Sequence, residues 1–198
     1  MIDPLACYIF IGRSGCGKGT QAKLLIEYLK QYHPDRSVLY LETGQGFRHF
    51  VKQDNHTATL ADRVIRESDH LPPSFLAISF WSNVLISEFT GRQDLVFDGS
   101  PRSLSEARVL NGALDFYGFG KRYVLNLDLS PETARARLKA RGRSDDKTEA
   151  EVDRRLRWFL SEVKPALDWY QEHENYEVLT VDGSRDIDAI HEEIISKL

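Results

Sequence analysis

Cysteine is scarce in this chain, which has two cysteines among its 198 residues. Cys7 and Cys16 do not form a CxxC pair, so neither a disulfide framework nor a zinc site is expected. Such sparing use of cysteine is typical of proteins in a reducing compartment, and we therefore expect a cytoplasmic protein.

A long apolar run is also missing. The apolar stretch near the amino terminus, residues 7–11, is too short to span a bilayer. Asp3 stands before it, where a secretory signal peptide would carry basic residues. We therefore expect no membrane association.

The chain has no excess of positive charge. It has 26 Lys and Arg and 30 Asp and Glu, which gives a formal net charge of −4. This negative net charge argues against a general nucleic-acid binder. Seventeen of the 26 basic residues are arginine, and seven of these lie within residues 135–157. Because the planar guanidinium group suits phosphate oxygens, the bias indicates a local phosphate-binding site.

Five short runs of aliphatic, aromatic and β-branched residues alternate with sequence of helical periodicity. This alternation predicts an α/β fold in which a five-stranded parallel sheet carries helices on both faces. No repeat, low-complexity tract or flexible linker divides the chain, so we expect one domain. The predicted strands are residues 7–11, 38–41, 95–97, 123–129 and 176–181.

A long helix is predicted in the last third of the chain. Thr148 and Glu151 have the spacing of a capping box, and apolar residues then recur at helical spacing as far as Tyr170. We expect Pro165 to bend this helix. Two further helices are expected over residues 104–117 and 187–198.

The segment GRSGCGKGTQ, residues 12–21, follows the first predicted strand directly and leads into a helix. Glycines allow a tight turn that exposes several backbone N–H groups, and the helix amino terminus adds partial positive charge. Lys18 is then placed to reach the terminal groups of a bound polyphosphate. We interpret this segment as a phosphate-binding loop.

The residue after Lys18 bears on how the phosphate loop would hold Mg²⁺. Nucleoside triphosphatases of this type usually have Ser or Thr there as a Mg²⁺ ligand, but here the position is Gly19 and Thr20 follows. Another group must then organise the metal. Asp98, at the end of the predicted strand 95–97, is the candidate, and we expect it to hold the metal through bound water. The alternative is that Asp98 only caps the turn before Gly99.

Four motifs occur in the order seen in the adenylate kinase family: GKGTQ at 17–21, TGQGFR at 43–48, DGSPR at 98–102, and the arginine-rich segment 137–156. The chain resembles that family from about residue 7 to its carboxyl terminus. The resemblance implies a three-layer α/β/α P-loop nucleoside monophosphate kinase fold. It also implies a single kinase domain over 1–198, with a monophosphate-binding insertion at about 43–73 and a short lid, without zinc, at about 138–147.

The same resemblance implies roles for individual residues. Those implied to bind ATP are Gly15, Cys16, Gly17, Lys18, Gly19, Thr20, Arg137, Arg141 and Arg185. Those implied to bind the monophosphate are Thr43, Arg48, His70, Leu71, Pro72, Gly99, Ser100, Pro101, Arg102, Glu106, Arg143 and Arg155. The implied catalytic residues are Lys18, Arg102, Arg141, Arg143 and Arg155.

The activity implied by the resemblance is reversible transfer of a phosphoryl group from Mg·ATP to AMP, which yields two ADP. Mg²⁺ is the implied cofactor, the partners are the nucleotides ATP, AMP and ADP, and the protein is expected to be a monomer. The many arginines suit this chemistry, because two polyanions must meet and the charge of the transferred group must be stabilised.

Glu106 departs from the family pattern, in which glutamine is common. A glutamine amide can accept from the exocyclic amine of adenine and donate to the neighbouring ring nitrogen, whereas an ionised carboxylate only accepts. Guanine presents two adjacent donors on that edge, so a carboxylate favours GMP. The structural alternative is a capping box between Ser103 and Glu106 that occupies the side chain.

Three functions therefore stay open on the sequence. The first is an adenylate kinase, which Thr43 favours because family members with pyrimidine acceptors tend to have a smaller residue there. The second is a kinase for GMP, UMP or CMP. The third is a catalytically weak nucleotide sensor, for which Glu106 and Gln45, where a carboxylate is usual, are the signs.

Overall fold

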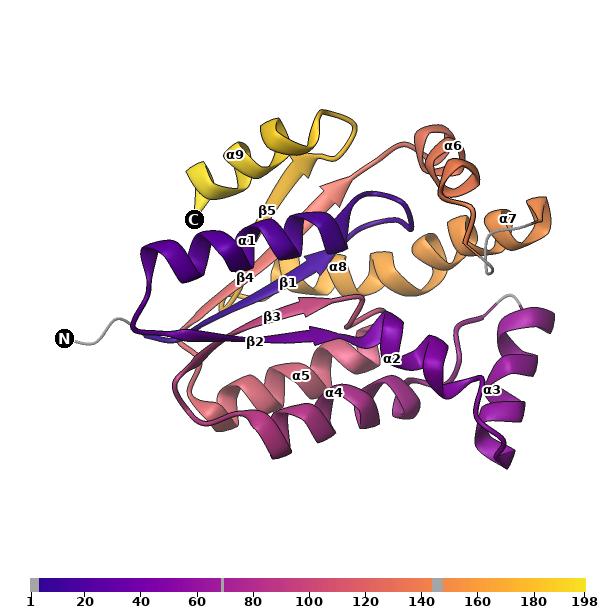
Figure 1. The fold of residues 1–198 in the computed structure, drawn as a ribbon, viewed down its shortest axis with the longest axis horizontal. Coiled ribbons are helices and arrows are strands. Elements are labelled where there is room, and N and C mark those ends of the chain that lie inside the picture. The colour runs from indigo at the N-terminus through magenta and orange to yellow at the C-terminus, as the bar shows by residue number, and fades with distance from the viewer. Residues whose placement is uncertain (1–3, 69, 144–147) are drawn as a thin grey trace.

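The computed structural model describes residues 4–68, 70–143 and 148–198. Five parallel strands form one sheet in the order β2-β3-β1-β4-β5 (Figure 1), which confirms the predicted parallel sheet. All five predicted strands are present, within three residues at each end. They are β1 Ala6–Ile11, β2 Ser37–Glu42, β3 Gln93–Asp98, β4 Lys121–Asp128 and β5 Glu177–Asp182.

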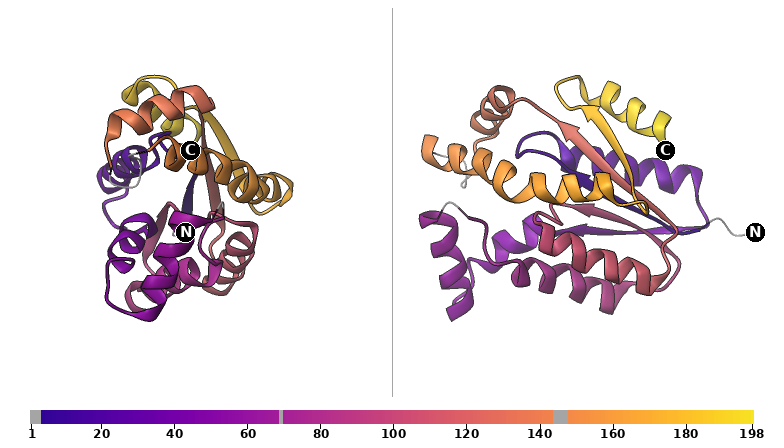
Figure 2. Two further views of the ribbon diagram at one scale, coloured as in Figure 1. Left: turned by 90° about the vertical axis from the view of Figure 1, so that its right-hand side faces the viewer. Right: turned by 180° about the vertical axis from the view of Figure 1, so that it is seen from behind.

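Helices cover both faces of the sheet (Figures 1 and 2). On one face lie α1 and α9, and on the other α4, α5 and α8. The helices are α1 Lys18–Tyr32, α2 Thr43–Phe50, α3 His56–Glu67, α4 Ser74–Glu88, α5 Leu104–Tyr117, α6 Pro131–Arg141, α7 Glu149–Trp158, α8 Lys164–Glu172 and α9 Ile187–Lys197. The three-layer α/β/α architecture is therefore confirmed.

The central strand β1 shows how the layers are held together. All six of its residues are buried, as expected for a parallel strand covered on both faces. Its side chains alternate: Tyr8 and Phe10 pack into the core beneath α1 and α9, and Ile9 and Ile11 pack into the core beneath α4, α5 and α8. One strand thus contributes to two apolar cores, which fixes the position of the loop that follows it.

The carboxyl ends of the strands bring the predicted motifs to one edge of the sheet. In the strand register Phe10 of β1 lies beside Asp98 of β3, and Glu42 of β2 lies on the other side of Asp98. The phosphate loop, the DGSPR segment and the start of α2 therefore leave the sheet together. Ligands of open α/β sheets bind at this edge.

The long carboxyl-terminal helix differs from the prediction. The capping box of Thr148 and Glu151 is confirmed, but the helix is interrupted by the π-helical turn η1, Phe159–Val163, before α8 begins. Pro165 follows η1 by two residues in a continuous run of helix, and the i→i−4 hydrogen bond that it cannot make would reach Ser161, within η1. The change of helical pitch therefore falls in the turn before the proline, where a proline disturbs a helix.

Residues 43–67 form two helices that the strand and helix patterns did not define. α2 packs against α4, whereas α3 extends beyond the carboxyl edge of the sheet (Figure 1). The predicted lid overlaps the end of α6, and its residues 144–147 lie outside the described part of the chain. Among the described residues, no helix combines the length and apolar character needed to cross a membrane.

Candidate active site

The phosphate loop joins β1 to α1 through glycines in unusual backbone conformations. Gly12, Gly15 and Gly17 have φ of 145°, 88° and 100°, a region that other L-residues rarely adopt. Gly17 is the residue that precedes the first turn of α1, and no side chain caps that helix. The free N–H groups at this helix amino terminus therefore face the loop, as an anion site requires.

Lys18 is the first residue of α1, and its ammonium group turns back over the loop. Its Nζ donates to the backbone carbonyl oxygens of Gly12, at 2.8 Å, and Arg13, at 3.0 Å. These carbonyls hold the ammonium group at the mouth of the loop. A bound polyphosphate would offer it stronger, charged acceptors than these neutral oxygens.

Asp98 lies against the same helix terminus. A Cβ placed on Gly19 would be 3.0 Å from Oδ2 of Asp98, so the carboxylate stands close to the position where other phosphate loops carry a hydroxyl. Tyr40 donates a hydrogen bond to the same Oδ2, at 3.2 Å. Burial and the negative charge of Asp98 raise the pKa of Tyr40, so the phenol stays a neutral donor and orients the carboxylate.

The surroundings of Asp98 suit a Mg²⁺ ion that is held largely through water. Mg²⁺ keeps several waters and typically takes one or two carboxylates together with substrate phosphates. Asp98 supplies one such carboxylate. The described residues contain no group of three or more His, Cys, Asp or Glu that could enclose a metal.

The DGSPR segment places Arg102 in the lining of the cleft that the phosphate loop also borders. Its Nε donates to the carbonyl oxygen of Gly99 at 2.6 Å, Gly99 has φ of 83°, and the Ser100–Pro101 peptide is cis. Thr43, at the start of α2, donates from Oγ1 to the carbonyl oxygen of Asp98 at 3.3 Å. These backbone bonds tie the start of α2 and the guanidinium group of Arg102 to the end of β3.

Arg102 lies among other cations. Burial is the largest cause that lowers its pKa, and the positive charges of Arg155 and Arg48 lower it further, against the opposing effects of Glu106 and Asp98. Guanidinium groups stay charged in proteins, so the lowered pKa mainly reflects the cost of burying this charge, to which repulsion by Arg155 and Arg48 adds. A phosphate placed among Arg48, Arg102 and Arg155 would relieve that repulsion.

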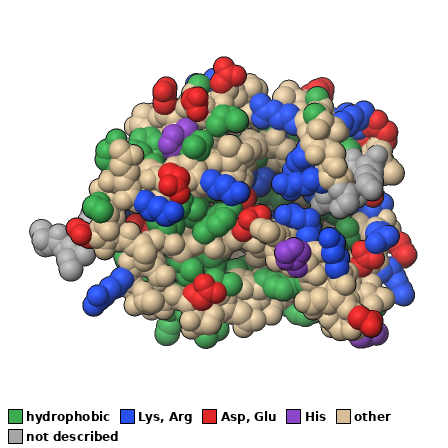
Figure 3. All heavy atoms as spheres, viewed as in Figure 1, with side chains coloured by type: hydrophobic (Ala, Val, Ile, Leu, Met, Phe, Trp, Pro, Cys, Tyr) green, Lys and Arg blue, Asp and Glu red, His purple; other side chains and the backbone are tan. Residues whose placement is uncertain are grey.

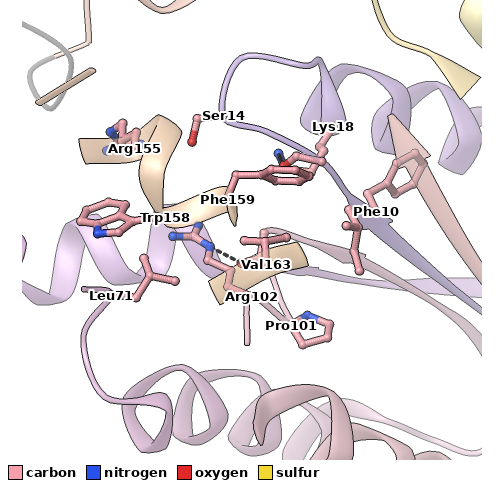
Figure 4. A pocket seen from close by; sticks show the side chains of 13 residues that line it. Phe10, Ser14, Lys18, Leu71, Pro101, Arg102, Arg155, Trp158, Phe159 and Val163 are labelled. Carbon is pink, nitrogen blue, oxygen red and sulfur yellow. Dashed lines mark hydrogen bonds between the residues drawn. The ribbon is translucent and has the colours of Figure 1, made fainter. Parts of the chain in front are cut away.

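A single cleft brings the predicted donor and acceptor residues together (Figure 4). Six of its lining residues, Lys18, Leu71, Gly99, Pro101, Arg102 and Arg155, were predicted site residues. Arg102 and Arg155 therefore line the same cleft as the phosphate loop. Gly12 and Ser14 belong to the predicted phosphate loop, although neither was singled out as a site residue. The sequence patterns did not indicate a site role for the remaining lining residues, which are Phe10, Ile11, Trp158, Phe159 and Val163.

Two of the unpredicted lining residues, Trp158 and Phe159, come from the same stretch of helix as Arg155. Arg155, Trp158 and Phe159 are spaced i, i+3 and i+4, so they share one helix face. Arg13 of the phosphate loop lies over the Phe159 ring, with its Cζ 4.1 Å from the ring centroid, a cation–π contact between the loop and this helix. This spacing from Arg155 could have indicated from the sequence alone that Trp158 and Phe159 lie on the same side of the helix as Arg155.

A second, more polar cleft lies beside α2. It is lined by Lys23, Glu42, Gln45, Arg48, His49, Lys52 and Arg143. Figure 3 shows basic side chains gathered on the side of the molecule where α2, α3 and α7 lie. Arg48 and Arg143, both predicted to bind the monophosphate, thus share one cleft, and Arg48 also pairs with Glu42 at 3.7 Å.

Arg137 and Arg185, two of the residues implied to bind ATP, lie close together. Arg137 of α6 donates to the carbonyl oxygens of Gly183, at 2.7 Å, and Ser184, at 3.1 Å, in the loop after β5 that also carries Arg185. Arg185 is instead paired with Glu193 of α9, and Arg141 lies half-buried at the end of α6.

The acceptor segment 70–72 approaches the helix that carries Arg155. His70 is exposed, and its Nδ1 lies 3.3 Å from Oε1 of Glu162. The next residue, Leu71, lines the main cleft, and Pro72 is half-buried. The two sides of the cleft therefore touch through this segment.

Glu106 is buried beneath Arg102, with 3% of its surface exposed. Its Oε2 accepts from the backbone N–H of Arg102 at 3.3 Å, and its own N–H donates to Oγ of Ser103 at 3.3 Å. Only this second bond belongs to a capping box, since the carboxylate accepts from Arg102 and not from the Ser103 backbone. The side chain is thus held locally, which supports the structural alternative in part.

Burial is the largest cause that raises the pKa of Glu106, although the Arg102 charge and hydrogen bonds from the Arg102 backbone, Ser100 and Ser103 oppose it. The folded state then keeps the Glu106 proton to a higher pH than the unfolded chain, whose ordinary pKa is 4.5. Stability attributable to this group is therefore present below pH 4.5 and is lost as the pH rises through the raised value.

We expect the Glu106→Gln variant to lose less stability than the parent as the pH is raised from 4.5. Urea unfolding at a series of pH values measures this, and the difference between the two proteins cancels the other titrating groups. Parallel stability curves for variant and parent would contradict the raised pKa.

Comparison with known proteins agrees with this geometry. Residues 10–175 match the model of the family described as adenylate kinase. The chain is 31% identical over 190 residues to adenylate kinase 1 of Nostoc sp., covering 96% of this chain and 97% of the relative. It is 30% identical over 186 residues to the adenylate kinase of Mycolicibacterium paratuberculosis, covering 92% and 93%, and 29% identical over 192 residues to that of Phocaeicola vulgatus, covering 95% of each. The matched region includes the phosphate loop and the helix that carries Arg155.

Proposed function

The chain belongs to the adenylate kinase family, and on that basis we propose that it catalyses reversible transfer of the γ-phosphoryl group of ATP to AMP, which yields two ADP. The observation that carries the proposal is the convergence of Lys18, Arg102 and Arg155 on one cleft beside the phosphate loop. A polyphosphate and a monophosphate bound there would have their phosphate groups side by side.

The proposed mechanism rests on position and charge. The backbone N–H groups of the phosphate loop and Lys18 bind the donor phosphates, and Arg102 and Arg155 hold the acceptor phosphate. The loose transition state spreads negative charge over the equatorial oxygens of the transferred group. Fixed cations then stabilise that charge without having to reorganise. No side-chain nucleophile is required.

Magnesium is the proposed cofactor. Asp98 would hold it through bound water, in the orientation that Tyr40 gives to the carboxylate. When bound, the ion neutralises charge on the donor phosphates. The absence of a hydroxyl at Gly19 is compatible with this arrangement, because Asp98 already stands beside that position.

Two segments are proposed to close over the substrates. The segment 43–73, which includes α2 and α3, would cover the acceptor, and the lid at about 138–147 would cover the donor phosphates. Arg143 is exposed and borders the α2-side cleft together with Arg48, so closure would bring it onto the phosphates. Closure excludes water and limits wasteful hydrolysis of ATP.

A coupled assay with ATP, magnesium and each nucleoside monophosphate tests the proposed reaction. Turnover with AMP at least tenfold above every other acceptor, about 1.4 kcal/mol in transition-state free energy, would support it. Higher turnover with GMP, UMP or CMP would show that the protein is a kinase for that monophosphate instead. Binding of nucleotides without turnover would identify the sensor instead.

GMP is the second candidate acceptor, because a carboxylate at Glu106 pairs with the two adjacent donors of guanine. We expect Glu106→Gln to raise the ratio of kcat/KM for AMP to that for GMP by about tenfold, since the amide supplies the missing donor to adenine. Parallel assays of both acceptors give the ratio. An unchanged ratio would show that the side chain does not read the base and serves only the local bonds to Arg102 and Ser103.

The assembly and location are also proposals. We propose that the protein acts as a monomer on small nucleotides alone. The negative net charge and the two free, buried cysteines are compatible with a cytoplasmic enzyme that does not bind nucleic acid.

A further inference from the structure

Trp158, the last residue of α7, is a buried donor with no partner. Its side chain lines the main cleft with 7% of its surface exposed. Its indole Nε1 is fully buried and makes no hydrogen bond to any residue in the described ranges 4–68, 70–143 and 148–198. Buried polar groups in native proteins are nearly always paired, so an orphan donor on the wall of a binding cleft calls for an explanation.

The two labelled neighbours of Trp158 do not supply an acceptor. In Figure 4 the indole lies between Arg155 and Leu71, with its nitrogen on the side of Leu71. Arg155 offers only donors, and Leu71 has an apolar side chain. An indole N–H is itself only a donor, so an oxygen or nitrogen atom that a ligand brings into the cleft would satisfy it.

The position of Trp158 favours the acceptor nucleotide over ATP. Figure 4 shows Phe159 between Trp158 and Lys18, so Trp158 lies on the side of the cleft away from the phosphate loop. Leu71 follows His70 in the segment that reaches across to α7 and η1. Arg102, which faces the acceptor side of the proposed reaction, lines the same cleft.

We propose that Trp158 is a binding residue for the acceptor monophosphate, with its Nε1–H donating to a ribose or phosphate oxygen of that nucleotide. This inference rests on the proposed function. The π-helical turn η1 begins directly after Trp158, and such turns often occur at functional sites. The turn starts where Arg155, Trp158 and Phe159 present one face to the cleft.

The test uses Trp158→Phe, which keeps an aromatic ring but removes the N–H group. Trp169→Phe is the matched control, because Trp169 lies on α8 and packs against Tyr170, His173 and Tyr176, outside the lining of the cleft. We expect Trp158→Phe to raise KM for AMP about tenfold, with KM for ATP and kcat changed less than about twofold. Trp169→Phe should leave all three values unchanged.

Intrinsic fluorescence gives a second readout that does not depend on turnover. AMP should change the tryptophan emission of the parent and of Trp169→Phe, but not that of Trp158→Phe. Adenosine alone and inorganic phosphate alone tell the two oxygens apart: a response to adenosine indicates the ribose, and a response to phosphate indicates the phosphate. If Trp158→Phe folds poorly, the double variant Trp81→Phe, Trp169→Phe leaves Trp158 as the only emitter.

The inference is overturned if Trp158→Phe has the parent KM for AMP and AMP leaves the emission of Trp158 unchanged. Failure of the proposed reaction is a separate result. In that case the parent turns over no acceptor, while the fluorescence titration still reports whether a monophosphate binds beside Trp158.

Discussion

Replacement of Lys18 by methionine is expected to lower kcat for phosphoryl transfer about a thousandfold. The ammonium group is held at the mouth of the phosphate loop by the carbonyls of Gly12 and Arg13, where the donor phosphates would take it over. A fixed cation at the position where charge develops typically contributes two to three orders of magnitude. Methionine keeps the length and apolar stem of lysine, so the helix and its packing should survive.

The assay for this prediction is the coupled measurement of ADP formation, with circular dichroism to confirm the fold. Lys30→Met is the matched control, since Lys30 lies on the same helix and is exposed, paired with Glu27. The control should retain parent activity. If Lys18→Met kept a tenth or more of the parent kcat, Lys18 would not be the residue that stabilises the transferred group.

Replacement of Arg155 by methionine is expected to lower kcat between a hundredfold and a thousandfold. Arg155 lines the cleft together with Lys18 and Arg102, and its charge contributes to the lowered pKa of Arg102. Two guanidinium groups that repel one another when no anion is present are arranged for an anion between them. Removing one of them should cost transition-state stabilisation more than substrate affinity.

Steady-state kinetics with ATP and AMP varied separately measure this effect. Arg157→Met is the matched control, because Arg157 lies on the same helix but is exposed and does not line the cleft. The control should change kcat less than about twofold. Equal losses in the two variants would mean that the general positive charge of α7, and not the position of Arg155, supports the reaction.

The parts of the fold that follow from local rules were predictable from the sequence. β1 and the loop after it have a distinct apolar run followed by glycines at the positions that need positive φ, so both were found. The Thr148 and Glu151 capping box was predictable for the same reason, because its two hydrogen bonds join residues three apart. The adenylate kinase resemblance supplied the arginines, which no local pattern distinguishes from surface charges.

The parts that depend on contacts between distant segments were not predictable. The π-helical turn η1 changes the helical phase, and its sequence, FLSEV, carries no signal of that change. Its first residue, Phe159, contacts Arg13, which lies far away in the sequence. The carboxylate of Glu106 likewise bonds the Arg102 backbone and not the Ser103 backbone, a choice that depends on how the DGSPR segment turns.

Arg185 illustrates the limit of transferring roles by motif. Its guanidinium group pairs with Glu193 of α9, whereas the neighbouring carbonyl oxygens of Gly183 and Ser184 accept from Arg137. The backbone of this loop is therefore tied to α6 and its arginine to α9. The role of Arg185 in binding ATP stays a prediction.

The most direct measurement follows the γ-phosphate itself. The protein is incubated with magnesium and ATP labelled at that phosphate, with and without AMP. If the cleft between Lys18, Arg102 and Arg155 joins donor and acceptor, the label appears in ADP only when AMP is present, and little inorganic phosphate is released. Label released as inorganic phosphate to the same extent with and without AMP would contradict direct transfer between two bound nucleotides.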